Sequence, residues 1–291
     1  MESKVISHRK ENGKMTLGVV AICYNEAEDL PGFLDNLLPW VDEIVLVDDG
    51  SKDATPALAA AAGEKVKFLA QPRQEGEYYA QQRNKGIDQA ESDWLLHMDI
   101  DERVTPQLAR EIRTAINASQ YRAFRFRRLN FFLHRPMQGG GWSDWNLVHL
   151  AQREVLRFRG MYHEGIDLQV DQAEIGQLHE KMWHLNDDSY LERLRKSANY
   201  QNEVVERIRQ QKGRLGFHAI WLSFVKEFAY KYFYKKGFRD GTAGLISAFH
   251  SASASFRAMA LVWDEQNRIP RQQLEREMQE RWQSNQSEKL G

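Results

Sequence analysis

Residues 94–102 read WLLHMDIDE, a short apolar run that ends in two carboxylates one residue apart. The apolar part predicts a buried strand, and open α/β sheets place their ligand sites beyond the carboxyl ends of such strands. Side chains two positions apart on an extended chain point to the same face. Asp99 and Asp101 can therefore face one hard cation whose other ligands are phosphate oxygens. By itself the Asp-x-Asp pattern is equally typical of a solvated turn or a helix N-cap.

Three more predicted strands precede this stretch, and a helix follows each of them. The strands are expected at Leu17–Cys23, Glu43–Val47 and Val66–Leu69, and the helices at Leu30–Leu38, Asp53–Ala62 and Glu77–Ala90. Strands that alternate with helices in this way predict a parallel, doubly wound sheet. Polar or acidic residues follow the first, second and fourth strands, which places them together at the carboxyl edge of the sheet.

The loop after the first strand contains neither Gly-x-Gly-x-x-Gly nor a Walker lysine loop, which argues against a dinucleotide or ATP site of those types. Two uses of the sheet edge remain open on the residues alone. In one, acids hold the base and ribose of a nucleotide while a metal ion holds its diphosphate. In the other, Asp99 is the nucleophile of a phosphate-ester reaction.

The composition narrows the class of protein. The chain has 291 residues, enough for a large core and two subdomains, and its formal net charge of −1 gives no support for nucleic acid binding. A single cysteine, Cys23, excludes an internal disulfide framework and suits a reducing compartment. We expect Met1–Lys14 to be a loose polar tail, not a signal peptide, and no stretch reaches the roughly 18 uninterrupted apolar residues of a membrane span.

The segment Tyr121–Gly160 is strongly basic, with eight arginines against two acids, Asp144 and Glu154. Basic and aromatic residues alternate in Tyr121–Phe132, which predicts a strand with one apolar face. The arginines either cover a solvated face of this strand or create a field that attracts a polyanionic substrate.

Two loops in and beyond this segment contain residues suited to catalysis. Gly139–Trp142 places an indole ring, on which sugars stack, beside three glycines, although Trp142 can equally belong to the core. In the loop Gly160–Gly165, Glu164 lies between a histidine and a glycine. A carboxylate in such a loop either acts as general base on a hydroxyl group or forms a salt bridge.

The last part of the chain predicts helices. His184 precedes them in an apolar patch and is either a hydrogen-bonded core histidine or a ligand. A capping box opens a helix over Ser189–Gly213, and two aromatic stripes follow at helical spacing over Phe217–Tyr232 and Leu245–Trp263. Lysines beside the stripes suit a membrane interface, and ordinary helix packing is the alternative. From Arg268 onward the chain is polar, and we expect it to fray.

Four motifs stand in order at the predicted strand ends and in the third helix. They are Ile22–Glu26 (ICYNE), Val47–Asp53 (VDDGSKD), Arg83–Gly86 (RNKG) and Met98–Glu102 (MDIDE). In this order the chain resembles the inverting family 2 glycosyltransferases, which have the GT-A fold. Gly140–Trp142 with Asp144, His163–Glu164 and Gly237–Gly241 are similar to a bacterial subgroup that includes lipopolysaccharide-core glucosyltransferases. The resemblance covers roughly Thr16 to Trp263.

The resemblance implies roles for the candidate residues. Those expected to bind the nucleotide are Cys23, Tyr24, Asn25, Glu26, Asp48, Asp49, Arg83, Asn84 and Asp99, with Asp49 and Asp48 assigned to uracil and ribose. Asp99 and Asp101 are expected to bind Mg²⁺ or Mn²⁺, and His184 to add a metal or phosphate contact. The metal ion offsets charge on the leaving nucleoside diphosphate. A single inverting displacement also needs a carboxylate base, for which Glu164 is the first candidate and Asp144 the second.

The acceptor side departs from the subgroup. Where the subgroup has an aromatic-Pro-Asp-aromatic-Gln run and an Arg-Leu-Phe-Arg-Arg strand, this chain has Ser143–Asn146 (SDWN) and Val148–Arg153 (VHLAQR). The acceptor and sugar of the subgroup are therefore not transferred to this chain, whereas the donor half shows no such break.

These observations predict an α/β protein with a GT-A, Rossmann-like, mostly parallel sheet flanked by helices, and a C-terminal helical extension. The expected divisions are a tail at 1–15, a GT-A domain at 16–186, a helical region at 187–268 and a polar tail at 269–291. Within the GT-A domain, the nucleotide-binding half is expected at 16–118 and the acceptor half at 119–186.

The expected activity is metal-dependent, inverting transfer of a hexose from a nucleotide sugar, with UDP as first choice, to a cell-envelope glycan or glycolipid such as lipopolysaccharide core. The expected location is the cytoplasm, peripheral on the inner membrane, with the oligomeric state open. One alternative is an Asp-nucleophile phosphohydrolase, although its acid pair belongs after the first strand. A GT-A-like binding protein without turnover is another. A nucleotidyltransferase would need a Gly-rich basic loop in place of Tyr24–Glu26.

Overall fold

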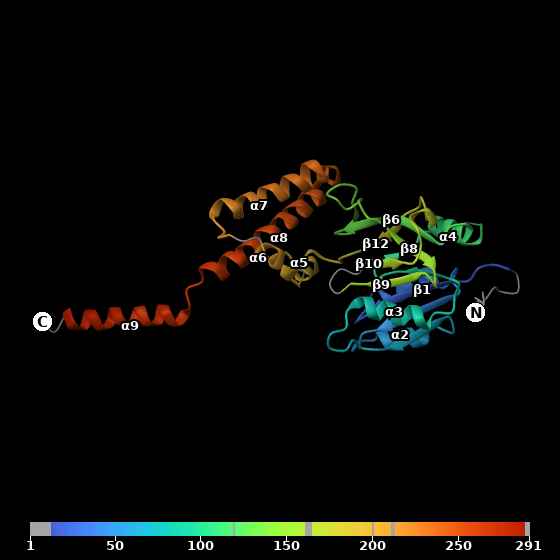
Figure 1. Cartoon of the computed structure of the whole chain (residues 1–291), viewed down its shortest axis with the longest axis horizontal. Coiled ribbons are helices and arrows are strands. Elements are labelled where there is room, and N and C mark those ends of the chain that lie inside the picture. The colour runs from blue at the N-terminus through green and yellow to red at the C-terminus, as the bar shows by residue number, and fades with distance from the viewer. Residues whose placement is uncertain (1–12, 119, 161–164, 200, 211–212, 289–291) are drawn as a thin grey trace. The chain divides into compact units, whose positions relative to one another are not determined.

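The computed structural model describes residues 13–118, 120–160, 165–199, 201–210 and 213–288. The chain divides into two compact units. We call Met1–Gln138 with Trp142–Asp188 the sheet unit, and Gly139–Gly141 with Ser189–Gly291 the helical unit. Figure 1 shows the strands gathered in the sheet unit and the longest helices in the helical unit.

A ten-stranded sheet organises the sheet unit, with the order β3-β2-β1-β4-β8-β6-β12-β5 and with β7 and β11 paired to β6. Its strands are β1 (Leu17–Cys23), β2 (Glu43–Asp48), β3 (Val66–Ala70), β4 (Trp94–His97), β5 (Glu102–Arg103), β6 (Ala123–Phe132), β7 (Arg135–Pro136), β8 (Asn146–Gln152), β11 (Ile175–Gln177) and β12 (Met182–His184). The first four strands are parallel, whereas β8 runs antiparallel to both β4 and β6. The α/β class is confirmed, with the parallel arrangement in the first half and a mixed sheet in the second.

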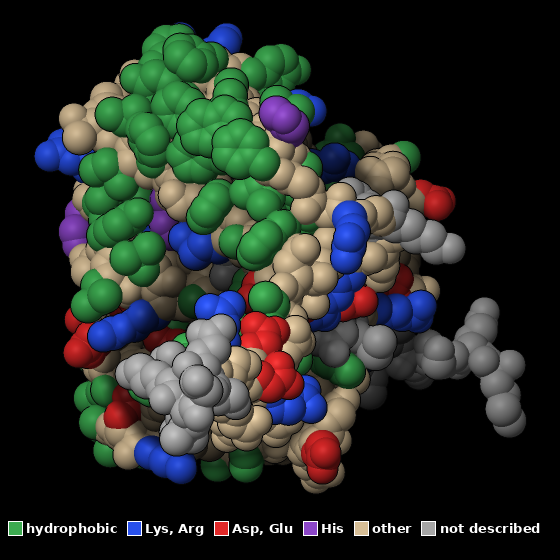
Figure 2. Space-filling model, turned by 90° about the vertical axis from the view of Figure 1, so that its left-hand side faces the viewer, with side chains coloured by type: hydrophobic (Ala, Val, Ile, Leu, Met, Phe, Trp, Pro, Cys, Tyr) green, Lys and Arg blue, Asp and Glu red, His purple; other side chains and the backbone are tan. Residues whose placement is uncertain are grey.

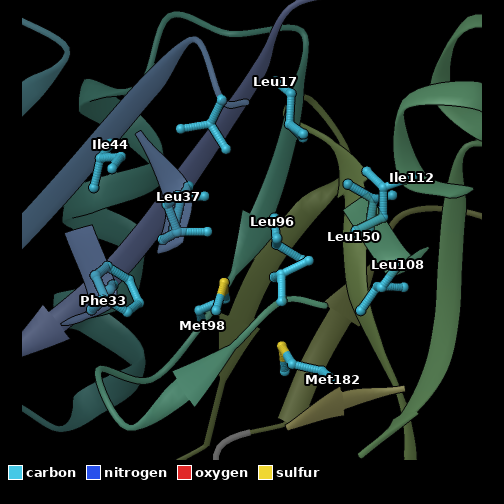
Figure 3. Close-up of a cluster of buried hydrophobic side chains, with 14 of the residues drawn as sticks. Leu17, Phe33, Leu37, Ile44, Leu96, Met98, Leu108, Ile112, Leu150 and Met182 are labelled. Carbon is cyan, nitrogen blue, oxygen red and sulfur yellow. The ribbon is translucent and has the colours of Figure 1, made fainter. Parts of the chain in front are cut away.

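Helices cover both faces of the sheet because alternate side chains of each inner strand point to opposite faces. The helices are α1 (Leu30–Leu37), α2 (Thr55–Ala61), α3 (Tyr79–Gln89) and α4 (Pro106–Ala118). In β4, Leu96 packs in the core that contains α1 and α4, and Leu95 in the core that contains α3. Figure 3 shows Leu96 among Leu37, Ile112 and Leu150 in the first of these cores. The smaller sheet of β9 (Leu156–Arg159) and β10 (Gly165–Leu168) also supplies apolar residues to the second core, and a short 3-10 helix, η1 (Gln172–Glu174), precedes β11.

The helical unit is built around one long helix. Its elements are α5 (Tyr190–Asn199), α6 (Gln201–Gln210), α7 (Phe217–Ala229), a π-helical turn η2 (Tyr230–Tyr234), a 3-10 turn η3 (Gly237–Asp240), α8 (Gly241–Asn267) and α9 (Arg271–Glu288). Both α6 and α7 pack against α8. The glycine-rich segment belongs to this unit, because Gly139 N donates to Asp240 Oδ2 at 2.8 Å and Gly140 N donates to the Lys235 carbonyl at 2.8 Å.

Large apolar side chains are exposed on α7, η2, η3 and α8. We call them the aromatic surface, which comprises Phe217, Trp221, Tyr230, Phe233, Tyr234, Phe238, Phe249, Phe256 and Trp263. Figure 2 shows hydrophobic side chains gathered over a large area, with lysine or arginine at its edge. Within the described ranges, one helical stretch, Gly237–Asn267, is long and apolar enough to cross a bilayer, a criterion that core helices of soluble proteins also meet.

Of two helical regions expected at the end of the chain, one agrees with the structure and one differs from it. The helix expected over Ser189–Gly213 is found in the described residues on both sides of position 200, as α5 and α6. The expectation of fraying after Arg268 was wrong, because Arg271–Glu288 forms α9. This segment is rich in helix-forming Gln, Glu and Arg, and it gains an Arg271–Glu275 ion pair of 3.3 Å at helical spacing.

Candidate active site

The order of the strands brings three polar segments to one edge of the sheet. Strands β2, β1 and β4 are neighbours and parallel, so their carboxyl ends lie together. Tyr24–Glu26 follows β1, Asp49–Ser51 follows β2, and Asp99–Glu102 follows β4. This is the edge at which open α/β sheets bind ligands, and it holds most of the residues predicted from the sequence.

Hydrogen bonds join the loops after β1 and β2. Asn25 adopts a left-handed backbone conformation with φ of 55°, which asparagine tolerates better than most residues. Asn25 N donates to Ser51 Oγ at 2.8 Å, and Lys52 N donates to Asn25 Oδ1 at 2.8 Å. Glu26 N donates to Thr55 Oγ1 at 2.8 Å. The two loops therefore form one surface, from which the ring of Tyr24 is 52% exposed.

The neighbouring acids Asp48 and Asp49 have different surroundings. Asp48 is buried, and its Oδ2 accepts hydrogen bonds from Gly50 N and Ser51 N, both at 3.0 Å. Cys23 lies beside it, and burial raises the pKa of this thiol well above its usual range, so the sulfur stays protonated. Asp48 and Cys23 thus hold the turn that presents Asp49.

Asp49 pairs with an arginine that the sequence analysis did not single out. The Asp49 carboxylate accepts hydrogen bonds from Arg73 N at 2.7 Å and Arg73 Nε at 2.6 Å. The guanidinium of Arg73 lies 4.1 Å from the ring centre of Tyr79, at the start of α3. A carboxylate next to a planar cation and an aromatic ring is a surface on which a base and a ribose hydroxyl can be bound.

Arg83 reaches from α3 to the acid at the end of β4. Its Nη2 donates to Asp99 Oδ1 at 2.7 Å, and its Nη1 lies 3.3 Å from His97 Nδ1. Burial disfavours the charged carboxylate of Asp99, but the Arg83 cation outweighs this effect and holds the pKa of Asp99 well below its usual range. Asp99 therefore remains an anion whose partner is Arg83.

Two stacked histidines lie next to this ion pair. The rings of His97 and His149 are 5.2 Å apart, and burial lowers the pKa of both, in the case of His149 to about 3. His149 lies at a bulge in β8, where Arg125 of β6 pairs with Val148 and Phe124 pairs with Leu150. Bulges of this kind re-aim side chains next to sites. Both rings are therefore uncharged at neutral pH.

Glu102 fixes the turn between the two aspartates from inside the protein. Its side chain is fully buried, Oε1 accepts from Arg128 Nη1 at 2.7 Å, and Oε2 accepts from Asp99 N at 2.9 Å. Burial, assisted by the charge of Asp99, raises the pKa of Glu102 to about 7, and Arg128 opposes the rise. Glu102 and Arg128 were absent from the predicted site, although Glu102 adjoins Asp101 and Arg128 lies in the arginine-rich strand.

Asp101 forms a second pair, with His184 of β12. His184 Nε2 lies 3.2 Å from Asp101 Oδ2, so a carboxylate oxygen and an imidazole nitrogen lie side by side. In the described part of the chain no group of three or more His, Cys, Asp or Glu side chains could hold a metal ion. The three expected ligands are thus brought together in part: Asp101 with His184, while Asp99 pairs with Arg83.

Three other predicted residues have different placements. Asn84 donates from Nδ2 to the Phe158 carbonyl at 2.9 Å and accepts from Phe158 N at 2.9 Å, so its side chain attaches α3 to β9. Asp144 is exposed in the segment before β8. Glu164 lies outside the described residues.

Comparison with known proteins finds one family model and several similar sequences. Residues 18–143 match the family model described as "Glycosyl transferase family 2". The lipopolysaccharide core biosynthesis glycosyltransferase LpsC of Rhizobium meliloti is 26% identical over 262 residues, which cover 86% of this chain and 93% of LpsC. An uncharacterized glycosyltransferase of Rickettsia felis is 24% identical, with coverage of 82% and 86%. A TPR repeat-containing protein of Synechococcus elongatus is 32% identical over 152 residues, but the match spans only 35% of that protein.

Two solved structures have lower identity. S. aureus TarS 1–349 in complex with UDP-GlcNAc has a TM-score of 0.46 and 15% identity, covering 85% of this chain and 84% of that chain. The mannosyltransferase PcManGT from Pyrobaculum calidifontis, in complex with GDP-Man and Mn²⁺, has a TM-score of 0.45 and 16% identity, covering 85% and 76%.

Proposed function

We propose that the protein moves a hexose from a nucleotide sugar to a cell-envelope glycan or glycolipid, with inversion at the transferred carbon, since residues 18–143 match the model of glycosyl transferase family 2. A UDP-sugar is the first candidate donor, and lipopolysaccharide core is the first candidate acceptor. The similarity to LpsC over most of both chains supports the acceptor class. The observation that carries the proposal is that Asp49, which follows β2, and Asp99 and Asp101, which follow β4, lie at the same carboxyl edge of the sheet.

The donor nucleotide would bind along β1 and β2. Asp49 accepts the ribose or base hydrogen bonds, while Arg73 and Tyr79 offer flat surfaces for the base. Tyr24, Asn25 and Glu26 would form the other wall. Arg83 supplies a fixed positive charge, and an incoming diphosphate would compete with Asp99 for it.

A divalent cation, Mg²⁺ or Mn²⁺, would bind at Asp101 and His184. Asp99 would become a third ligand when an incoming diphosphate displaces it from Arg83. Two protein ligands suffice for a cation that takes its other ligands from substrate phosphates and water. The cation would neutralise the charge that develops on the leaving nucleoside diphosphate. Glu102 keeps the turn between the two aspartates in place by accepting a hydrogen bond from Asp99 N.

The base that removes the proton of the acceptor hydroxyl would be Glu164, with Asp144 as the second candidate. Inverting transfer needs a carboxylate on the face of the sugar opposite the leaving group, within hydrogen-bond reach of the hydroxyl. Arg83 already neutralises Asp99, which makes Asp99 a poor choice for this role.

The helical unit would bring the enzyme to its acceptor at an anionic lipid surface on the cytoplasmic face of the inner membrane. The aromatic surface presents Phe217, Trp221 and Phe233, which are more than half exposed. Lys226, Lys236 and Arg239 lie on the same helices and turns, also exposed. Aromatic rings with neighbouring cations are the combination that binds the interface of an anionic bilayer. Flotation with vesicles of phosphatidylglycerol should capture the full chain, and the Trp221→Ser/Phe233→Ser variant should stay unbound.

Two other functions were open on the sequence. An Asp-nucleophile phosphohydrolase would use Asp99, whose ion-pair partner is Arg83, as its nucleophile. A non-catalytic binding protein would bind the donor without turnover. The match of residues 18–143 to the family 2 model, together with the carboxylates at the sheet edge, supports the proposed function.

Titration calorimetry with a panel of nucleotides and nucleotide sugars, in Mn²⁺ and in EDTA, tests the proposal. Metal-dependent binding of one nucleoside diphosphate, with tighter binding of one of its sugars, is the expected result. Absence of nucleotide binding under both conditions would reject the donor site.

A further inference from the structure

His184 lies in the middle of a small three-stranded ladder. In this ladder β12 runs between β5 and β6, and His184 is paired with Glu102 of β5 on one side and with Asn130 of β6 on the other. Leu185 N also donates to the Asp101 carbonyl at 3.0 Å. The backbone therefore fixes the imidazole between Asn130 and Asp101.

Asn130 has one side-chain orientation that satisfies its neighbours. Its side chain is buried, with only 2% of the residue exposed, and one end lies 2.6 Å from the Trp142 carbonyl oxygen. A carbonyl oxygen only accepts hydrogen bonds, so the NH₂ group of Asn130 must face Trp142. The carbonyl end of Asn130 then faces His184 Nδ1 at 2.8 Å.

This orientation determines which ring nitrogen of His184 carries the proton. Asn130 Oδ1 can only accept, so Nδ1 must be the N–H donor, and the lone pair of the neutral ring lies on Nε2. Nε2 faces Asp101 Oδ2 at 3.2 Å. Two acceptors so close together repel each other unless a proton or a cation lies between them, and a divalent cation is one group that can fill this place.

We propose that Asn130 is a positioning residue for the metal site, which holds His184 in the tautomer whose Nε2 binds the cation together with Asp101. Histidine ligands in metal sites commonly donate their second N–H to such a fixed acceptor, and removal of that acceptor lowers metal affinity. The inference rests on the proposed function for the metal role of His184, but the tautomer itself is independent of it.

Two substitutions of nearly equal size separate this role from a packing role. Asn130→Leu removes the acceptor, whereas Asn130→Asp keeps an oxygen acceptor toward Nδ1. Both lose the NH₂ donor to Trp142, and Asn130→Asp also turns a carboxylate oxygen toward that carbonyl, so the Asp variant carries the larger local cost. Thermal unfolding of both variants checks that the sheet unit is folded.

The first readout is the nitrogen–proton correlation spectrum of histidine rings in the full-length, metal-free protein at alkaline pH, with His184→Ala to assign the signal. The wild type and Asn130→Asp should show the proton on Nδ1. Asn130→Leu should move it to Nε2, where Asp101 accepts it. A wild-type ring protonated on Nε2 would overturn the inference.

The second readout is Mn²⁺ affinity by titration calorimetry without donor. Asn130→Leu should bind Mn²⁺ about 10- to 100-fold more weakly than the wild type, and Asn130→Asp should retain most of the affinity. Equal losses in the two variants, or no loss in Asn130→Leu, would contradict the positioning role. Lack of transfer activity with the predicted tautomer intact would instead count against the proposed function alone.

Discussion

The side chains of the sheet edge are held by hydrogen bonds, whereas the rings of the aromatic surface are exposed. At the edge, Asp48, Asp49 and Glu102 each accept hydrogen bonds from neighbouring residues, so the polar groups are held in place before any ligand arrives. On the aromatic surface of the helical unit, large rings such as Trp221 and Phe233 stay 59% exposed. The sheet unit thus presents ordered polar groups at its edge, whereas the helical unit presents exposed apolar side chains.

The largest effect is expected at the sheet edge. Asp101→Ala should lower transfer on the order of 1,000-fold, the upper range for losing one electrostatic contact in a transition state, and should weaken Mn²⁺-dependent donor binding. The matched control is Asp88→Ala, which removes an exposed acid of the same unit whose partner is Arg157 at 3.3 Å. Steady-state kinetics and calorimetry measure both effects. Equal activity of Asp101→Ala and the wild type would remove Asp101 from the site.

The identity of the base is tested by a second pair of variants. Glu164→Gln should cut transfer by ~100-fold or more while donor affinity stays close to that of the wild type, because a general base acts on the acceptor and not on the nucleotide. Asp144→Asn should have the smaller effect. If the order of the two variants is reversed in kinetic assays, Asp144 is the base.

Two Arg–Glu pairs, one in each unit, allow the stability contributed by a buried ion pair to be compared with that of an exposed one. Arg128→Met leaves the fully buried Glu102 without its cation and should destabilise the sheet unit by about 3 kcal/mol. Arg209→Met removes an exposed partner of Glu265 in the helical unit and should leave stability unchanged within error. Urea unfolding followed by circular dichroism measures both. A similar change in the two variants would show that burial does not distinguish the pairs.

Two apolar residues sharpen the same comparison. Leu96→Ala creates a cavity in the core shown in Figure 3 and should cost about 2–4 kcal/mol of unfolding free energy. Trp221→Ala removes a ring that is largely exposed, so unfolding should change little while binding to anionic vesicles weakens. Loss of stability in Trp221→Ala with unchanged vesicle binding would place this ring in an ordinary packing contact.

Local pattern was sufficient to predict the strands and their acidic ends. The apolar runs that became β1, β2 and β4 each lead into a polar segment, and a parallel order forces those segments to one edge. The break at Gly237 between two aromatic helices was also visible in the sequence, since glycine and a change of stripe coincide there.

Partners distant in sequence were not predictable from pattern. Asn84 was predicted to bind the donor nucleotide, but its side chain forms hydrogen bonds with the backbone of Phe158, which is 74 residues away in the sequence. Glu102 of β5 contacts Arg128 of β6 because β12 pairs with both strands and holds them near each other. No local sequence pattern predicts this arrangement of strands. The sequence analysis identified His184 as a candidate ligand but not Asn130. The proposed role of Asn130 depends on the same three-stranded ladder, which local sequence patterns do not predict.

The most direct test of the central claim is to follow a reaction by NMR. The full-length protein would be incubated with Mn²⁺, a nucleotide sugar chosen by the calorimetric panel and a lipopolysaccharide-core acceptor. The account predicts release of the nucleoside diphosphate and a new glycosidic bond whose anomeric configuration is opposite to that of the donor. Transfer with retained configuration, or no release of nucleoside diphosphate from any donor that binds, would contradict it.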